Sequence, residues 1–267
     1  MYEKFFKLKE APFRVLPDPR FLWYSEQHLE AKAKILHYIN SSSGPILLKA
    51  DVGTGKTTLA KRIHHELQAD ESKKVVYIFA PKLTSSNAFL RFAMDEFGVK
   101  TERSYAESLK NFSEYLIEQK KAGITPVLLI DEGQNMNRDM LLLIQHLFNF
   151  STDTEFLIQI AIFAQPDIAS KLKRLESLKS RLSFAKLTGL DRDGTQKLME
   201  FRWTVSGGEK LPFTSKALDE VYRITGGIPR AIVKLANEAL LATAIKQRQA
   251  VDKDTVLASV SEISMTD

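Results

Sequence analysis

The stretch ILLKADVGTGKTTLAKRI, residues 46–63, decides the fold of this chain. An apolar run typical of a buried strand leads into a glycine-containing turn, and a helical pattern follows from Lys56. The pattern G-x-x-x-x-G-K-[ST] indicates a phosphate-binding loop when a strand precedes it and a helix follows it. The stretch meets that condition, and it departs from the pattern only at the first glycine, where this chain has Ala50.

We predict that this loop holds the phosphates of ATP. Gly53 and Gly55 allow backbone torsions and a close approach that a Cβ would block. Backbone N–H groups at the start of the helix can then surround phosphate oxygens. Lys56 would place a cation on the β- and γ-phosphates, and the Thr57 hydroxyl can ligate Mg²⁺. The expected nucleotide contacts in the loop are Val52, Gly53, Thr54, Gly55, Lys56, Thr57 and Thr58.

The alanine at position 50 is compatible with this prediction. It falls where the strand becomes the loop, furthest from the γ-phosphate. If its φ is negative, alanine fits with little strain, and if φ is positive the cost is about 1 kcal/mol. Neither conformation abolishes ATP binding.

A second stretch, TPVLLIDEGQNM at residues 125–136, supplies adjacent carboxylates at the end of an apolar strand. Ligands of open α/β sheets bind at the carboxyl ends of the strands. We expect Asp131 to hold Mg²⁺ through water and Glu132 to polarise the attacking water. Strand alternation points the two side chains in different directions, which suits two separate tasks.

Four further polar residues are candidates for the same site. Gln165, after the strand in IQIAIFAQPDI, is positioned to touch the γ-phosphate or the attacking water, although an ordinary turn glutamine is the alternative. Arg174 and Arg181 stand near a helix end, either as a solvated basic face or as an arginine finger, a device worth ~10³-fold or more in rate. Arg230 lies in the first turn of a predicted helix, where an arginine opposes the helix dipole and a nucleotide phosphate would be a suitable partner.

Apolar runs alternate with amphipathic patterns up to residue 190, which predicts an α/β fold with a parallel sheet. The expected strands are residues 45–49, 74–79, 126–131, 156–163 and 185–187. The expected helices between them are 57–68, 86–97, 105–120, 140–149 and 168–178. Beyond residue 190 only helices are expected, at 194–205, 215–225, 229–246 and 254–260.

Composition limits the class of protein. The chain has 267 residues, 44% of them hydrophobic, which is enough for a sizeable core. It has no cysteine, which excludes disulfides and thiolate-ligated metals. The N-terminus lacks the apolar region of a signal peptide, and the most apolar run, residues 155–164, is far shorter than the ~20 residues that cross a bilayer. We therefore expect a cytoplasmic protein, and its net charge of +5 permits an acidic partner without requiring one.

These stretches together resemble the AAA+ ATPases of the ExeA/GspA/MshM group, within a wider set that includes the transposition regulators TnsC and MuB. Nearly the whole chain takes part. The motifs that carry the resemblance are MYEKFFKLKEAPFRVLPDPRFLWYSEQHLEA (1–31), VGTGKTTL (52–59), LLIDEGQNM (128–136), AQPDI (164–168) and FTSKALDEVYRITGGIPRAIVKLANEALL (213–241). In the first of these the matching residues are Phe13, Asp18, Pro19, Arg20, Phe21, His28 and Glu30.

The resemblance implies a P-loop AAA+ αβα sandwich with a five-stranded parallel sheet, followed by a small all-helical lid domain. It implies that residues 1–40 form an N-terminal segment packing on the ATPase core, with the αβα domain at 41–190 and the lid at 191–267. It assigns Lys56 and Thr57 to Walker A and Asp131 and Glu132 to Walker B. It also implies that Gln165 is sensor 1, Arg230 is sensor 2, and Arg181 is the better finger candidate.

Three small residues depart from the family pattern. Ala50 replaces the first Walker glycine, and Ala164 replaces the glycine that usually precedes the Q-P pair. Ala80 stands where an asparagine often restrains the catalytic glutamate. These departures put the speed of hydrolysis in doubt more than the binding of ATP.

Two functions remain open for the same ATPase. The first is a secretion or type IV pilus ATPase, an expectation weakened because ExeA-type proteins usually continue into a membrane span and a wall-binding domain. The second is a TnsC/MuB-like regulator that forms ATP-dependent filaments on double-stranded DNA and recruits a transposase. A helicase loader or initiator is a third, less supported hypothesis. The main two predict a homo-oligomer, either a hexameric ring or a helical filament.

The DNA hypothesis names its own residues. Lys82, in the loop after the second strand, and Lys100, Thr101 and Arg103, in a second loop, stand where TnsC-like proteins carry DNA-contacting residues. Such phosphate contacts give affinity without sequence specificity and a strong salt dependence. Solvated loops with scattered lysines are the alternative explanation.

Overall fold

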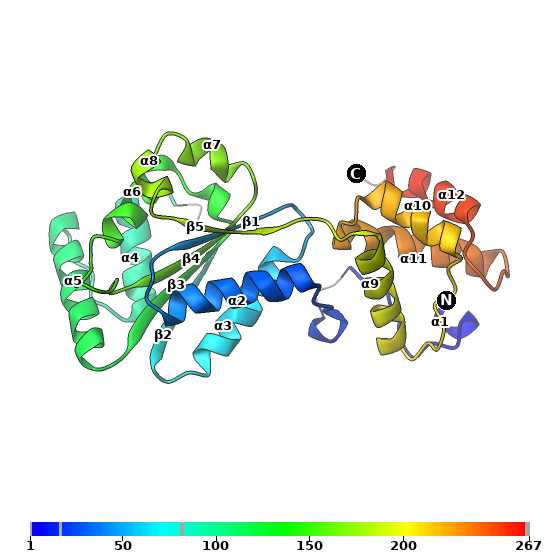
Figure 1. Ribbon diagram of the computed structural model, residues 1–267, viewed down its shortest axis with the longest axis horizontal. Coiled ribbons are helices and arrows are strands. Elements are labelled where there is room, and N and C mark those ends of the chain that lie inside the picture. The colour runs from blue at the N-terminus through cyan, green and yellow to red at the C-terminus, as the bar shows by residue number, and fades with distance from the viewer. Residues whose placement is uncertain (1, 16–17, 81–82, 265–267) are drawn as a thin grey trace. The chain divides into compact units, whose positions relative to one another are not determined.

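The computed structural model describes residues 2–15, 18–80 and 83–264. They form two compact units, whose elements are shown in Figure 1. The first, which we call the sheet unit, comprises Gln27–Asp51 and Lys56–Leu187. The second, the helical unit, comprises Met1–Glu26, Val52–Gly55 and Thr188–Asp267.

Five parallel strands form the sheet, in the order β2-β3-β4-β1-β5. Strands β3 and β4 are buried along almost their whole length, because helices cover both faces of a parallel sheet. This confirms the predicted α/β class and the parallel sheet. The strands are β1 (Ile46–Ala50), β2 (Lys73–Phe79), β3 (Thr125–Asp131), β4 (Gln159–Ala164) and β5 (Ser183–Leu187).

Helices pack on both faces of the sheet (Figure 1). On one face lie α2 (Glu26–Asn40) and α3 (Lys56–Gln68). The other face carries α4 (Ser86–Phe97), α5 (Tyr105–Lys121), α6 (Arg138–Leu147), α7 (Ile168–Leu172) and α8 (Glu176–Lys179). Serine and asparagine side chains at Ser85, Ser104 and Asn137 cap α4, α5 and α6 by accepting a backbone N–H three residues on.

Most elements begin or end a few residues from their predicted bounds, and two differ for a reason that the structure shows. The predicted helix at 168–178 is two short helices, α7 and α8, because the chain leaves helical geometry at Leu175, where φ is −134° and ψ is 62°. The predicted strand at 156–163 begins only at Gln159, since Phe156 instead forms an isolated antiparallel bridge with Ser151.

The helical unit has its own apolar core. It contains α1 (Tyr2–Phe5), α9 (Arg192–Val205), α10 (Ser215–Thr225), α11 (Pro229–Ile245) and α12 (Lys253–Ser264). Tyr2, Ala11 and Phe13 pack in this core beside Met199 and Trp203. The N-terminal residues 1–26 therefore group with these helices, whereas we expected residues 1–40 to pack on the ATPase core. Their apolar side chains are the reason, because they fill space between the helices.

A close backbone contact fixes the start of α11. The Leu190 N–H donates to the Gly227 carbonyl at 2.8 Å. A Cβ built on Gly227 would lie 1.8 Å from the Leu190 carbonyl oxygen, and one on Gly189 would lie 2.2 Å from the Gly226 oxygen. Only glycine permits these approaches, so the two glycines position the turn that begins α11.

Among the described residues, no helix is both long enough and apolar enough to cross a membrane.

Candidate functional site

Lys56 joins two carboxylates at the carboxyl end of the sheet. It is the first residue of α3, and its side chain is 6% exposed. Its Nζ donates to Asp131 Oδ1 at 2.8 Å and also to Glu132 Oε1. Asp131 is the last residue of β3 and is fully buried. Removing one partner of such a buried ion pair strongly destabilises the folded protein, because the other charge then stays buried without compensation.

Asp131 has three hydrogen-bond donors. Besides Lys56, the Glu132 backbone N–H donates to Oδ1 at 2.8 Å, and the Tyr77 hydroxyl of β2 donates to Oδ2 at 3.0 Å. Burial and the negative charge of Asp131 raise the pKa of Tyr77, so its hydroxyl keeps its proton. Both carboxylate oxygens are therefore held in a defined orientation.

Glu132 is held in a left-handed backbone conformation, with φ at 54° and ψ at 38°. This region is unfavourable for a residue with a side chain and is found most often at functional sites. Gln134 Nε2 donates to Glu132 Oε2 at 2.5 Å, and Gln165 Nε2 donates to the same oxygen at 3.4 Å. Burial alone would raise the pKa of Glu132, but the hydrogen bonds from Lys56 and Gln134 and the charge of Lys56 lower it. Glu132 is thus an ionised, oriented carboxylate.

Strand order explains how Gln165 reaches this carboxylate. Strand β4 lies between β3, which ends at Asp131, and β1, which leads to the loop, and Gln165 follows β4 directly. The Gln165 N–H also donates to Gln134 Oε1 at 3.0 Å. The structure therefore brings Lys56, Asp131, Glu132 and Gln165 together at one place, as we predicted from the sequence. Their roles in chemistry stay predictions.

Gly133 allows the acidic turn to approach β4. A Cβ at Gly133 would lie 2.5 Å from Ile162 Cγ2 and 3.5 Å from Ala164 Cβ. Lys171 of α7 then ties the turn from outside, since its Nζ donates to the carbonyls of Gln134 and Met136. Local packing thus sets the position of Gln134 and of the strained Glu132.

The loop retains the conformation that its glycines allow. Ala50 is the last residue of β1 and has extended backbone, so alanine is accommodated without left-handed strain. Gly53 and Gly55 have φ values of 82° and 99°, which favour glycine. Two further predicted loop contacts, Thr57 and Thr58, lie in the first turn of α3, where backbone N–H groups have no partners within the helix. Thr54 is buried in the loop.

Within the helical unit, Arg230 contacts the segment Val52–Gly55. The Arg230 N–H donates to the Gly53 carbonyl at 3.2 Å. A Cβ at Gly53 would come within 3.0 Å of both Arg230 Cβ and Ile228 Cγ2. Val52, Gly53 and Arg230 line one cavity of about 280 Å³, together with Ile224, Thr225, Ile228, Ala231, Lys234, Leu235 and Val260. The cavity therefore has two cationic side chains, Arg230 and Lys234, beside mostly apolar ones.

A family model described as "AAA domain" matches residues 39–172, the segment that carries Lys56, Asp131, Glu132 and Gln165. The chain belongs to the AAA domain family. The matched segment is the one that holds the loop and both carboxylates.

Among curated proteins, the chain is 32% identical over 247 residues to general secretion pathway protein A of Aeromonas hydrophila. The matched region covers 91% of this chain and 45% of the relative. The chain is 24% identical over 206 residues to the replication factor C small subunit of Sulfurisphaera tokodaii, covering 76% of this chain and 54% of the relative. The chain therefore spans about half the length of these relatives. The resemblance to the GspA group is confirmed.

Solved AAA structures share the fold. Drosophila ORC bound to DNA superposes with a TM-score of 0.70 at 17% identity, covering 94% of this chain and 64% of that one. The Aeropyrum pernix ORC1 protein in complex with DNA gives a TM-score of 0.64 at 17% identity, covering 96% and 70%. At such identity the likeness shows the fold alone.

The residues of this AAA domain fit a nucleotide with magnesium. Thr57 and Asp131 offer the oxygen atoms that Mg²⁺ prefers. In the part of the chain that the structure describes, no group of three or more His, Cys, Asp or Glu residues could form a metal cage. Mg²⁺ needs no such cage, because it usually takes one or two protein oxygens and completes its shell with water and phosphate.

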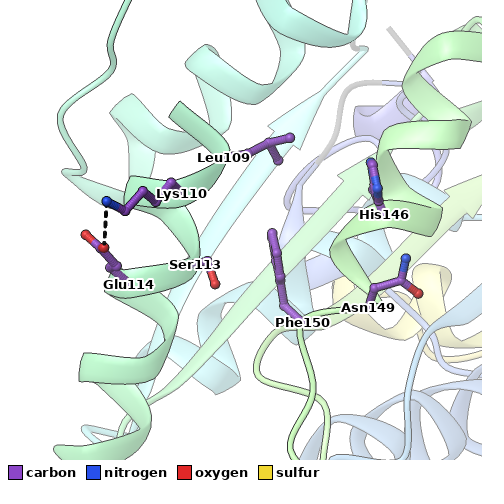
Figure 2. A pocket seen from close by; sticks show the side chains of 7 residues that line it. All are labelled: Leu109, Lys110, Ser113, Glu114, His146, Asn149 and Phe150. Carbon is purple, nitrogen blue, oxygen red and sulfur yellow. Dashed lines mark ion pairs between the residues drawn. The ribbon is translucent and has the colours of Figure 1, made fainter. Parts of the chain in front are cut away.

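The finger candidates lie near the α8 region. Arg181 follows α8, is exposed, and donates to Asn149 Oδ1 at 2.9 Å. Arg174 is exposed between α7 and α8. Asn149 also lines a cavity of about 510 Å³ between α5 and α6, which Figure 2 shows with Leu109, Lys110, Ser113, Glu114, His146 and Phe150.

The proposed DNA-contacting residues are placed only in part. Lys82 lies outside the described residues. Lys100 is exposed and forms an ion pair with Glu102 at 3.0 Å, which offsets its charge. Arg103 is exposed and Thr101 is half-buried in the same loop.

Two residues of the network were not predicted from the sequence: Tyr77 and Gln134. Tyr77 is an ordinary strand tyrosine by pattern, and only the pairing of β2 with β3 brings it to Asp131. Gln134 stands in the acidic motif itself, and its amide donates to Glu132 Oε2. A polar residue two positions after the second carboxylate was the available signal.

Proposed function

We propose that this chain is a magnesium-dependent ATPase that serves a secretion or type IV pilus complex, in a role similar to that of the Aeromonas protein. The observation that carries the ATPase proposal is Lys56, buried at a helix N-terminus and bonded to both Asp131 and Glu132. The 32% identity to general secretion pathway protein A supports the secretion role.

The residues of this chain divide the work. ATP supplies the phosphoanhydride that is cleaved, and Mg²⁺ supplies positive charge beside the phosphates. Lys56 binds phosphate oxygens in competition with the two carboxylates that it now contacts. Thr57 would ligate the metal through its hydroxyl, Asp131 would hold it through water, and Arg230 lines the same cavity as Gly53 with a second cation.

Glu132 would accept a proton from the attacking water. Its low pKa means that the carboxylate is ionised and ready as an acceptor at neutral pH. Release of Lys56 to phosphate would remove one of the donors that lower this pKa. Gln134 and Gln165 keep Oε2 oriented while this happens.

The test uses binding and turnover together. Wild-type protein should bind a fluorescent ATP analogue with Mg²⁺ and hydrolyse ATP. Lys56→Ala should lose binding, whereas Glu132→Gln should keep binding and lose hydrolysis by a factor on the order of 10² or more. Wild-type protein that binds no ATP would refute the proposal.

We further propose that the chain acts as an oligomer, in which Arg181 reaches the nucleotide of a neighbouring subunit. Its exposure and its neutral partner, Asn149, leave the guanidinium able to exchange to a phosphate. Arg181→Ala should then remove hydrolysis and spare ATP binding, and Arg174→Ala is the matched control. Unchanged turnover in Arg181→Ala would contradict this role.

Duplex DNA separates the secretion role from transposition. ATPase activity is measured with and without long duplex DNA at two salt concentrations, and the protein is imaged with a non-hydrolysable ATP analogue. We expect no DNA response. Filaments on DNA with salt-sensitive stimulation would instead support the transposition hypothesis.

A further inference from the structure

Tyr77 lies between the helix that begins at Lys56 and the carboxylate that Lys56 contacts. Its ring lies against His64 of α3, with ring centroids 5.3 Å apart, and its hydroxyl donates to Asp131 Oδ2 at 3.0 Å. The parallel register pairs Tyr77 with Leu129, two residues before Asp131, so the side chain points along the sheet toward its carboxyl end. The His64 ring of α3 thus packs against the Tyr77 ring, while the Tyr77 hydroxyl bonds to Asp131.

We propose that Tyr77 is a positioning residue for the magnesium site, which orients the Asp131 carboxylate through its hydroxyl. This inference rests on the proposed ATPase function and deepens it. The hydroxyl occupies Oδ2, whereas Lys56 and the Glu132 N–H bind Oδ1. The two oxygens of Asp131 are therefore not equivalent.

The proposed role of Tyr77 depends on Lys56 leaving Asp131 to bind a phosphate. When Lys56 turns to a phosphate, Asp131 loses its cation at Oδ1. The Tyr77 hydroxyl then remains as a side-chain donor to this carboxylate. Its bond to Oδ2 would keep the plane of the carboxylate fixed, so that Oδ1 would stay available to the magnesium site.

The experiment measures how strongly Mg²⁺ tightens nucleotide binding. A fluorescent ATP analogue is titrated with and without Mg²⁺ against wild type, Tyr77→Phe and a control, Tyr115→Phe, which removes a hydroxyl from another partly buried ring packed on the same unit's core. Because a hydrogen bond to a charged group is worth a factor on the order of ten, Tyr77→Phe should lose about tenfold of the Mg²⁺-dependent tightening. Binding without Mg²⁺ should be unchanged in both variants.

A second variant and a fold check support the interpretation. His64→Ala removes the ring that packs on Tyr77 and should lose a smaller part of the Mg²⁺ effect. Thermal unfolding of all variants reports whether they are folded, and a purely structural role would lower the unfolding temperature without changing the Mg²⁺ effect.

The outcomes distinguish the two proposals. Equal Mg²⁺ effects in wild type and Tyr77→Phe would overturn the role of Tyr77 and leave the ATPase proposal standing. A wild-type protein whose nucleotide binding does not respond to Mg²⁺ would overturn the magnesium-dependent ATPase proposal, and the role of Tyr77 with it.

Discussion

Gln134 donates its side-chain amide to Glu132 Oε2 at 2.5 Å, from a position two residues further along the chain. This contact restrains the carboxylate from within its own motif. It occurs in a chain whose Ala80, after β2, has no polar side chain to offer. The acidic turn therefore restrains Glu132 from within, in addition to the bonds from Lys56 and Gln165.

Removing this amide should slow hydrolysis without weakening ATP binding. Gln134→Ala frees Oε2 from its shortest partner, so the orientation of Glu132 broadens. We expect turnover to fall on the order of tenfold, measured as phosphate release at saturating ATP. The control is Gln145→Ala on α6, whose amide donates to Ser177 at 2.9 Å on the surface. Equal turnover in both variants would contradict the restraint.

The left-handed backbone at Glu132 predicts an unusual order of stabilities. At this position Glu132→Gly should be more stable to urea than Glu132→Ala by about 1 kcal/mol, because glycine adopts positive φ without strain. At Glu114, in the middle of α5, the order should reverse by about the same amount, because glycine weakens a helix interior. The same order at both positions would show that Glu132 is unstrained.

Acid should remove a stabilisation that Glu132 supplies. The folded-state pKa of Glu132 lies below the ordinary glutamate value of about 4.3, so the unfolded state binds the proton first. The contribution is present above that value and is lost as pH falls through the folded pKa. The difference in unfolding free energy between wild type and Glu132→Gln should therefore be larger at pH 6 than at pH 3. A difference independent of pH would contradict the lowered pKa.

Two glycines with the same φ of 73° should respond very differently to alanine. Gly227→Ala places a Cβ 1.8 Å from the Leu190 carbonyl oxygen, while a Cβ at Gly123 meets nothing within 4 Å. Gly123→Ala should cost about 1 kcal/mol for its conformation alone. Gly227→Ala should cost several times more, seen as a lower urea midpoint, because backbone must move. Similar losses would mean that the contact at Leu190 relaxes freely.

The sequence by itself determined the phosphate loop, the alternation of strands and helices, and the placement of Lys56, Asp131, Glu132 and Gln165. These follow from local patterns: side-chain periodicity predicts each element, and parallel strands place their carboxyl ends at one edge. The motifs around these residues also resemble the AAA family, and the family model over residues 39–172 confirms that resemblance. Even Ala50 could be judged acceptable once its place at the end of a strand was recognised.

Only the tertiary structure decided which side chains complete the site and where the N-terminal residues belong. Tyr77 reaches Asp131 because β2 pairs with β3 in one register, and a shift of one residue would turn its side chain to the other face. Tyr2 and Phe13 pack in the helical unit because apolar space exists there, which no linear pattern reports. Such contacts join residues distant in sequence, so the physical cause lies in packing and pairing, and these are properties of the folded chain.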